Sequence, residues 1–132
     1  MLKTVAVDDC GVRINTMIVE GQIMGGLTEA YAMASMQFMT FDAEGNCIGS
    51  NFMDYLLPTA MEIPNIEVHH LETISPGGEN DFRGVGENNI ISTPAAITNA
   101  IEDALSPFGA RVDTQYNPPS RILELAGIIP RA

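Results

Sequence analysis

A carboxylate in a glycine-rich setting is the group in this sequence best placed to do chemistry. The loop that directly precedes Glu87 consists of Gly84, Val85 and Gly86, and the apolar spacing of residues 90–105 predicts a helix after it. A glutamate at such a junction can act as a general base, and the glycines allow close approach to the backbone. The alternative is a helix-start glutamate that complements the helix dipole. These residues alone do not decide between the two roles.

A side-chain amide lies in a second glycine-rich stretch, 65 residues before Glu87. Gln22 stands in "VEGQIMGG" near the start of a predicted helix. There it could donate a hydrogen bond to a ligand oxygen or simply face solvent. The glycine-rich loop at 75–86 fits neither the P-loop nor the dinucleotide-binding pattern, so we do not expect it to bind phosphate.

Neither the histidines nor the cysteines form a recognisable site. His69 and His70 are adjacent on a predicted strand and therefore point to opposite faces. Cys10 and Cys47 are far apart and show no CxxC spacing, which argues against a disulfide framework or a zinc site. We expect both thiols to be small structural residues in a reducing, cytoplasmic setting. No metal ligand is predicted among the residues of this chain.

The composition restricts the class of protein. The 132 residues suit a single domain, 1–132, and 45% of them are hydrophobic. The formal net charge of −11 argues against nucleic acid and against an anionic membrane surface as partners. No stretch reaches the roughly 20 apolar residues of a membrane span.

Hydrophobic periodicity predicts strands and helices that do not strictly alternate. The expected strands are a short one within 3–11 that runs into a turn, a returning strand at 12–16, one at 66–73 and one at 108–114. Residues 39–51 are expected to form a helix end or strand, a tight turn at 42–46 and a flanking strand after it. The expected helices are 19–41, one that begins at Ser92 or Thr93 with Pro94 in its first turn, and a short one from Pro119. Methionines between positions 17 and 39 are expected to fill the core. This mixture predicts an α+β fold in which a small mixed sheet packs against helices.

The order of several short segments resembles a known family. The segments are "VDDCG", "VEGQIMGGL", "DAEGN", "NFMDYLLPTA", "IEVHHLET", "RGVGE" and "TPAAITNAIEDAL". Together they resemble the C-terminal portion of the molybdenum-binding large subunit of the xanthine dehydrogenase, aldehyde oxidoreductase and carbon monoxide dehydrogenase family. The resemblance covers roughly residues 5–125.

The resemblance implies roles for individual residues. Glu87 matches the active-site base beside molybdenum, which takes a proton from a metal-bound hydroxyl. Gln22 matches a glutamine that hydrogen-bonds the metal's oxo ligand or the pterin. Gly84, Val85 and Gly86 would give the cofactor access to the backbone. The implied cofactor is of the molybdopterin type, and both the plain pterin and its cytosine dinucleotide form remain open.

The resemblance also implies partners. Family large subunits are several times longer than this chain, so the cofactor is expected only with the remainder of the large subunit, and none is expected in the isolated chain. Iron–sulfur and flavin subunits would carry electrons away. Exposed apolar faces would otherwise pair two copies into a homodimer. The substrate stays open among aldehydes, N-heterocycles and carbon monoxide. The alternative to an enzyme part is a non-catalytic binding or assembly module that keeps this scaffold.

Overall fold

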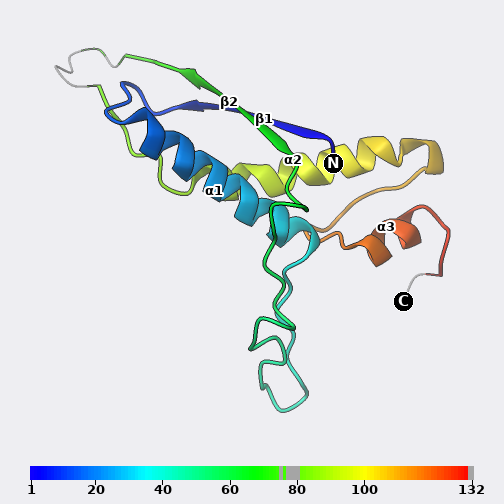
Figure 1. The fold of residues 1–132 in the computed structure, drawn as a ribbon. Helices are drawn as coiled ribbons and strands as arrows, with labels where there is room; N and C mark the ends of the chain where they lie inside the picture. Colours follow the sequence, from blue (N-terminus) through cyan, green and yellow to red (C-terminus); the bar gives the residue numbers. More distant parts are fainter. Residues whose placement is uncertain (75, 77–80, 131–132) are drawn as a thin grey trace.

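A thin sheet lies over two helices in this protein. The computed structural model describes residues 1–74, 76 and 81–130. The elements in chain order are β1 (Lys3–Asp9), α1 (Thr16–Ser35), β2 (Asn65–Leu71), α2 (Asn88–Ala104), the 3-10 turn η1 (Ser106–Phe108) and α3 (Pro119–Leu125). Figure 1 shows the strands in one layer and α1 and α2 in the other. The predicted α+β class is therefore confirmed.

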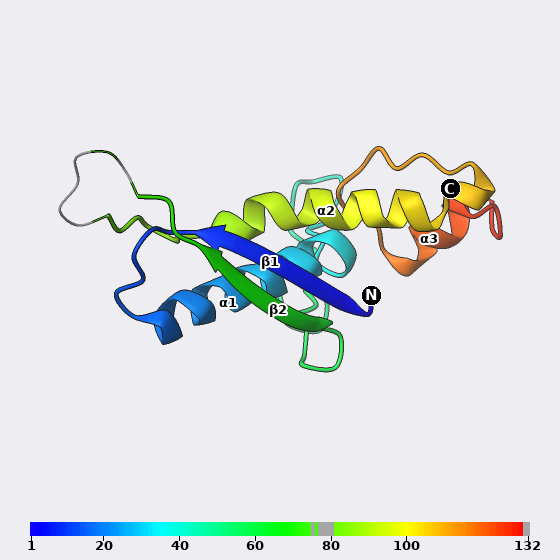
Figure 2. The same cartoon turned by 90° about the horizontal axis from the view of Figure 1, so that it is seen from above.

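The sheet consists of β1 and β2, which run parallel with Lys3 opposite Asn65 and Asp9 opposite Leu71. The predicted mixed sheet is thus a parallel pair in the described part of the chain. Parallel neighbours need a long crossover, and α1 together with residues 36–64 supplies it. Seen from above, β1 lies on the side of the sheet nearer α2 (Figure 2).

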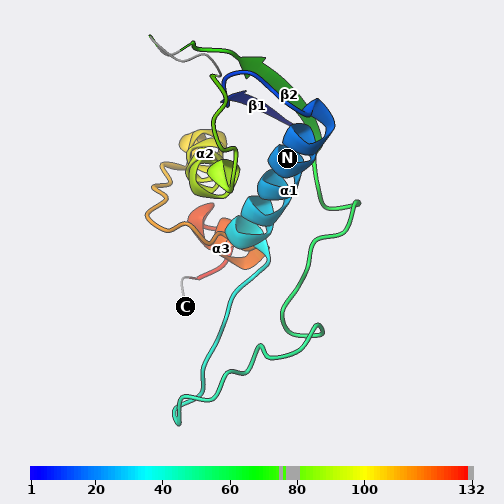
Figure 3. The same cartoon turned by 90° about the vertical axis from the view of Figure 1, so that its left-hand side faces the viewer.

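The core is small and lies between the sheet and α1. Ala6, Ile23 and Leu27 are its buried centre, and partly buried hydrophobic side chains pack around them, namely Val19, Ile66, Val68 and Val85. Figure 3 looks along the layers and shows the sheet covering the helices on one side only.

The longest predicted helix is confirmed, but it both starts and ends earlier than the expected 19–41, because α1 spans Thr16–Ser35. The α1 helix begins at Thr16, and the side chain of Asn15 caps it by accepting a hydrogen bond from the Ile18 backbone N–H at 3.2 Å. Asparagine is a strong N-cap residue. The predicted returning strand at 12–16 is therefore wrong, because its last residues form the cap and first turn of α1.

The predicted start of α2 is also wrong. The helix begins at Asn88, and Pro94 lies inside it rather than in the first turn. An interior proline removes one helical hydrogen bond and costs about 3 kcal/mol. Pro94 is fully buried, and this packing offsets part of the local cost.

Two further predicted elements lie in the C-terminal third of the chain, and one of them is wrong. Residues 108–114 do not form the predicted strand: they leave η1 as a coil, and the Val112 backbone N–H donates to the Glu102 carboxylate at 2.8 Å. The predicted last helix is confirmed as α3. The segment between them docks on α1, because the Asn117 backbone N–H donates to the Ala34 carbonyl at 2.7 Å.

Residues 36–64 form an arm that leaves the body between α1 and β2 (Figure 1). The predicted tight turn is present, with Asp42 accepting from the backbone N–H groups of Glu44 and Asn46, but the flanking strands reduce to a single bridge between Phe41 and Cys47. Several methionines expected in the core are instead exposed. Their exposed fractions are 77% for Met17, 42% for Met24, 39% for Met33 and 53% for Met39.

Candidate active-site loop

Glu87 occupies the N-cap position of α2 and is exposed. Its backbone carbonyl accepts a hydrogen bond from the Ile90 N–H at 3.0 Å. Its side chain makes no capping hydrogen bond. A carboxylate at the N-terminus of a helix complements the helix dipole even without a capping bond, so this position is compatible with both the dipole role and the general-base role, and the exposed carboxylate makes no capping hydrogen bond.

The short loop before Glu87 combines open backbone with one inward anchor. Gly86 has φ +50°, a conformation that favours glycine. A Cβ added at Gly84 or Gly86 would meet no heavy atom within 4 Å. Val85 lies between them and packs its side chain against the core. The loop thus presents bare backbone to the outside while one partly buried side chain holds it in place.

Contacts with the turn after β1 hold the start of this loop. Gly11 bridges to Phe82, the Val12 backbone N–H donates to the Asp81 carbonyl at 2.7 Å, and the Arg83 backbone N–H donates to the Cys10 carbonyl at 2.8 Å. Gly11 has φ +66°, and a Cβ there would lie 2.1 Å from the Asp81 carbonyl oxygen. Only glycine fits this position.

A carboxylate at the end of β1 braces the same region. The Asp9 carboxylate accepts hydrogen bonds from the backbone N–H groups of Gly11 at 3.0 Å and Thr73 at 3.2 Å. Hydrogen bonding to Thr73, then the Gly11 N–H and the nearby Arg83 charge lower the pKa of Asp9. Arg83 also donates to the Thr73 carbonyl at 2.6 Å. Asp9 therefore ties β1, the end of β2 and the loop together.

Gln22 lies on the exposed surface of α1, and its side chain makes no hydrogen bond within the described residues. One turn further along the same helix, Gly26 packs against Asn89, with its Cβ position 3.2 Å from the Asn89 Cβ. Asn89 is buried and donates to the Asp8 carboxylate at 3.3 Å. Gln22 lies about one helical turn before Gly26 in α1, and Glu87 lies two residues before Asn89 at the start of α2. The contact between Gly26 and Asn89 therefore brings these two parts of the chain near each other.

The sequence did not identify the residues that position the loop. The loop is held by Asp9, Gly11 and Asn89. None of these residues belongs to a recognised sequence motif that includes Glu87. A glycine that follows an Asp-Asp-Cys stretch is a signal for a turn. Nothing in the local sequence shows that this turn meets residues 81–83, about 70 positions later.

The other candidate groups do not form a site. The ring of His69 contacts Glu67 at 2.6 Å, whereas His70 lies on the other face and is 3.6 Å from Glu20. Cys10 is buried, Cys47 is partly exposed, and both are free thiols. Within residues 1–74, 76 and 81–130, no group of three His, Cys, Asp or Glu side chains could hold a metal ion. In the same residues, no helix has the length and apolar character needed to cross a membrane.

The loop and the adjacent helix surface can do a limited set of things chemically. The Glu87 carboxylate can accept a proton, the Gln22 amide can donate or accept a hydrogen bond, and the loop backbone lies open. The nearby Arg83 side chain is engaged with Thr73 and Asp9.

Sequence comparison links the chain to molybdenum enzymes. A family described as "Molybdopterin cofactor-binding domain" matches residues 1–64. The carbon monoxide dehydrogenase large chain of Hydrogenophaga pseudoflava is 50% identical over 104 residues, which cover 79% of this chain and 13% of that protein. The nicotine 6-hydroxylase large subunit of Paenarthrobacter nicotinovorans is 44% identical over 108 residues, covering 82% of this chain and 13% of that protein.

Solved structures show the same fold. A Cu,Mo-CO dehydrogenase in its carbon monoxide reduced state superposes with a TM-score of 0.85 at 40% identity, over 94% of this chain and 16% of that chain. Quinoline 2-oxidoreductase from Pseudomonas putida 86 gives a TM-score of 0.86 at 40% identity, over 96% of this chain and 16% of that chain. The chain therefore spans less than a fifth of the length of these relatives.

Proposed function

We propose that this chain supplies the active-site base and part of the cofactor pocket of a molybdopterin-dependent hydroxylase. The chain belongs to the family of molybdenum-binding large subunits that includes carbon monoxide dehydrogenase, xanthine dehydrogenase and aldehyde oxidoreductase. The observation that carries the proposal is the Glu87 carboxylate, exposed and without a capping bond, at the end of a loop with open backbone. The chain is incomplete alone, and the remainder of a large subunit completes the site.

The residues present fit such a cofactor. The space above Gly84 and Gly86 is open, so a cofactor can approach the loop backbone without meeting a side chain of those residues. The Gln22 amide has no partner within the described residues and is available to a pterin or oxo group. When bound, the cofactor supplies the redox centre that takes electrons from the substrate. Val85 contributes through its backbone, because its side chain packs inward.

Glu87 acts as the general base in this proposal. A carboxylate oxygen accepts a proton from the group that attacks the substrate, and the start of α2 fixes the position of the Glu87 backbone. The loop is held through Gly11 and Asp9 on one side and through Asn89 on the other. These contacts hold the backbone from which the Glu87 side chain extends, and a positioned backbone is a precondition for general-base catalysis.

The remainder of the enzyme determines the substrate in this proposal. The sequence of this chain is 50% identical to a carbon monoxide dehydrogenase large chain and 44% identical to a nicotine 6-hydroxylase large subunit over the matched residues. A segment shared so evenly between different reactions serves a common step. We further propose that iron–sulfur and flavin subunits carry the electrons away and that the cofactor is either the plain pterin or its cytosine dinucleotide form.

Co-purification tests this proposal. The tagged chain is co-expressed with the polypeptide that supplies the rest of the large subunit, and molybdenum in the purified complex is measured by elemental mass spectrometry. The proposal expects about one molybdenum atom per complex, and release of the bound pterin identifies its form. A stable complex without molybdenum would instead support the alternative of a non-catalytic assembly module.

A further inference from the structure

A groove of about 350 Å³ lies between β1 and α2, apart from the outward surface of the Glu87 loop. One wall consists of residues that are consecutive in β1, from Lys3 to Asp8. Side chains of consecutive strand residues point to alternate faces of a sheet. A wall to which every residue in a row contributes is therefore the edge of the strand, where its backbone lies.

The opposite wall is a single stripe of α2. Its members are spaced three or four positions apart and are mostly small, namely Asn89, Ser92, Thr93, Ala96, Ile97 and Ala100. Ser92, Ala96 and Ala100 are exposed, whereas Thr93 and Ile97 are buried. Small side chains on this stripe leave space between the helix and the strand edge, and Leu27 adds apolar surface to the groove.

The strand edge in this groove is open. Among the described residues, β1 pairs with β2 alone, so one edge of β1 has no neighbouring strand. An open edge presents unpaired backbone N–H and C=O groups and is a template for another strand. A strand would lie about 4.8 Å from β1, in the space that the small residues of α2 leave free.

We infer that this groove receives an extended segment of the remaining large subunit, which adds a strand to the sheet beside β1. The inference rests on the proposed function, in which that remainder completes the enzyme. The chain spans 13% of the carbon monoxide dehydrogenase large chain that it matches, so most of such a protein lies outside it and can supply a strand. Main-chain hydrogen bonds give such strand addition its affinity, and side-chain pockets give it specificity.

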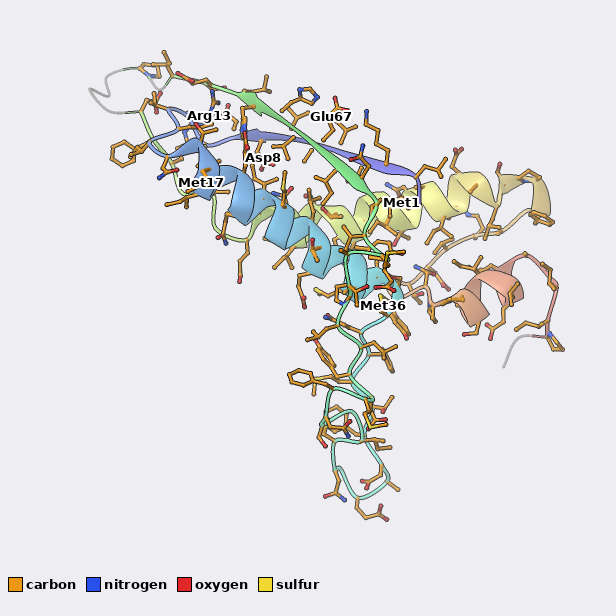
Figure 4. All side chains as sticks on the ribbon, viewed as in Figure 1. Met1, Asp8, Arg13, Met17, Met36 and Glu67 are labelled. Atoms are coloured by element: carbon orange, nitrogen blue, oxygen red, sulfur yellow. The ribbon has the colours of Figure 1, made fainter. Side chains whose placement is uncertain are left out.

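The lining defines the segment that fits. Alternate side chains of the added strand face Leu27 and Ile97. The side chains of the added strand at those positions are therefore apolar and of moderate size. The hydrogen bond between Asp8 and Asn89 links the two walls at one end, and Met1 lines the other end. Figure 4 labels Met1 and Asp8 at these two ends.

Two neighbouring alanines provide a matched test. Ala95 and Ala96 are both exposed on α2, but only Ala96 lines the groove. Ala96→Arg places a long charged side chain in the groove, whereas Ala95→Arg places it outside. Arginine favours helices almost as well as alanine, so neither change is expected to disturb α2 itself. In co-expression, Ala96→Arg should lower the amount of remaining large subunit captured at least tenfold, and Ala95→Arg should leave it within twofold of the wild type.

Equal capture by both variants would overturn the inference while leaving the proposed function intact. Failure of the wild-type chain to capture any partner would overturn both. A second measurement does not depend on the variants: in the wild-type complex, amide hydrogen exchange should be slow at every residue from 3 to 8, because β1 would be bonded on both edges, and not only at the alternate amides that face β2. Fast exchange at every other amide of β1 would show that its edge stays open, and would contradict strand addition.

Photo-crosslinking identifies the occupant. A benzophenone amino acid at position 96 in the complex should cross-link to one extended segment of the remaining large subunit, with apolar residues at alternate positions. The same group at position 95 should not cross-link to that segment. A cross-link from position 96 to a second copy of this chain would show that self-pairing fills the groove, which would overturn the inference.

Discussion

The carboxylate of Glu87 differs in its surroundings from the structural carboxylates of this chain. Asp9, Asp42 and Glu62 each accept hydrogen bonds from nearby backbone N–H groups, and these bonds contribute to the lowering of their pKa values. Glu87 makes no capping hydrogen bond, although it stands where a capping side chain is common. A carboxylate that gives up this local bond is available for a ligand or a proton, which is what the proposed base requires.

The fit at Gly11 leads to the first prediction. Gly11→Ala should lower the free energy of unfolding by about 1–3 kcal/mol, since it combines a strained backbone conformation with a collision against Asp81. Denaturant unfolding followed by circular dichroism measures the change. Gly84→Ala is the control, because its Cβ meets open space and its φ is not in the left-handed region. Equal stability of the Gly11 variant and the wild type would show that the turn is not held as described.

Acid should weaken the anchor at Asp9. Because hydrogen bonding to Thr73 and Gly11 lowers the pKa of Asp9 when the chain is folded, the contribution of Asp9 to stability is present above the unfolded-state pKa of about 3.9. That contribution is lost as the pH falls through the lower folded-state value. Stability measured from pH 6 to pH 2 should therefore fall less steeply in Asp9→Asn than in the wild type.

The matched control for this experiment is Asp103→Asn. Asp103 is exposed and its side chain makes no hydrogen bond or ion pair in the described part of the chain. Its replacement should leave the shape of the pH profile unchanged. A wild-type profile that coincides with that of Asp9→Asn would mean that the Asp9 carboxylate does not hold the loop.

Among the elements, the contact between α1 and α2 matters most for the site. Gly26 and Asn89 bring the two helices close enough for α1 to carry Gln22 near the start of α2. Glycine costs about 1 kcal/mol in a helix interior relative to alanine. The close approach explains why glycine is nevertheless used at position 26, while nothing in the structure explains its use at Gly25.

The two adjacent glycines give an element-scale prediction. Gly26→Leu should destabilise the protein by about 1–3 kcal/mol, because the new side chain forces the helices apart. Gly25→Leu should raise stability by up to about 1 kcal/mol, because its Cβ position is open and leucine favours helices. Thermal unfolding of both variants compares them directly. A destabilised Gly25 variant beside an unaffected Gly26 variant would contradict the packing.

Elements with strong periodicity were predictable from the sequence, and their boundaries were not. The apolar stripe through Ile23 and Leu27 located α1, and alternation located β2. The errors came from two local features. Asn15 acts as a helix cap where a strand was expected, and buried packing allows Pro94 inside a helix. The candidate residue Glu87 came from local sequence, whereas its anchors Asp9 and Gly11 depend on long-range contacts that a single sequence does not display.

The whole molecule exposes apolar side chains that a self-contained domain would bury. Phe52, Met53 and Met61 on the arm are more than 80% exposed, and Met17 at the start of α1 is 77% exposed. Met24, Met33 and Met39, which were also predicted in the core, lie on the surface as well. Large exposed apolar surface marks sites of interaction, and the chain covers only a small part of its relatives. Both observations support the proposal that other parts of the enzyme cover this surface.

Turnover of the assembled, molybdenum-containing complex with Glu87→Gln shows whether Glu87 is the base. Loss of a general base typically costs a factor of about 10²–10⁴ in rate. We expect a loss of at least a hundredfold in kcat at unchanged molybdenum content, whereas Glu44→Gln, a change at an exposed glutamate on the arm, should retain full activity. Full turnover by Glu87→Gln at equal molybdenum content would contradict the assignment of Glu87 as the base.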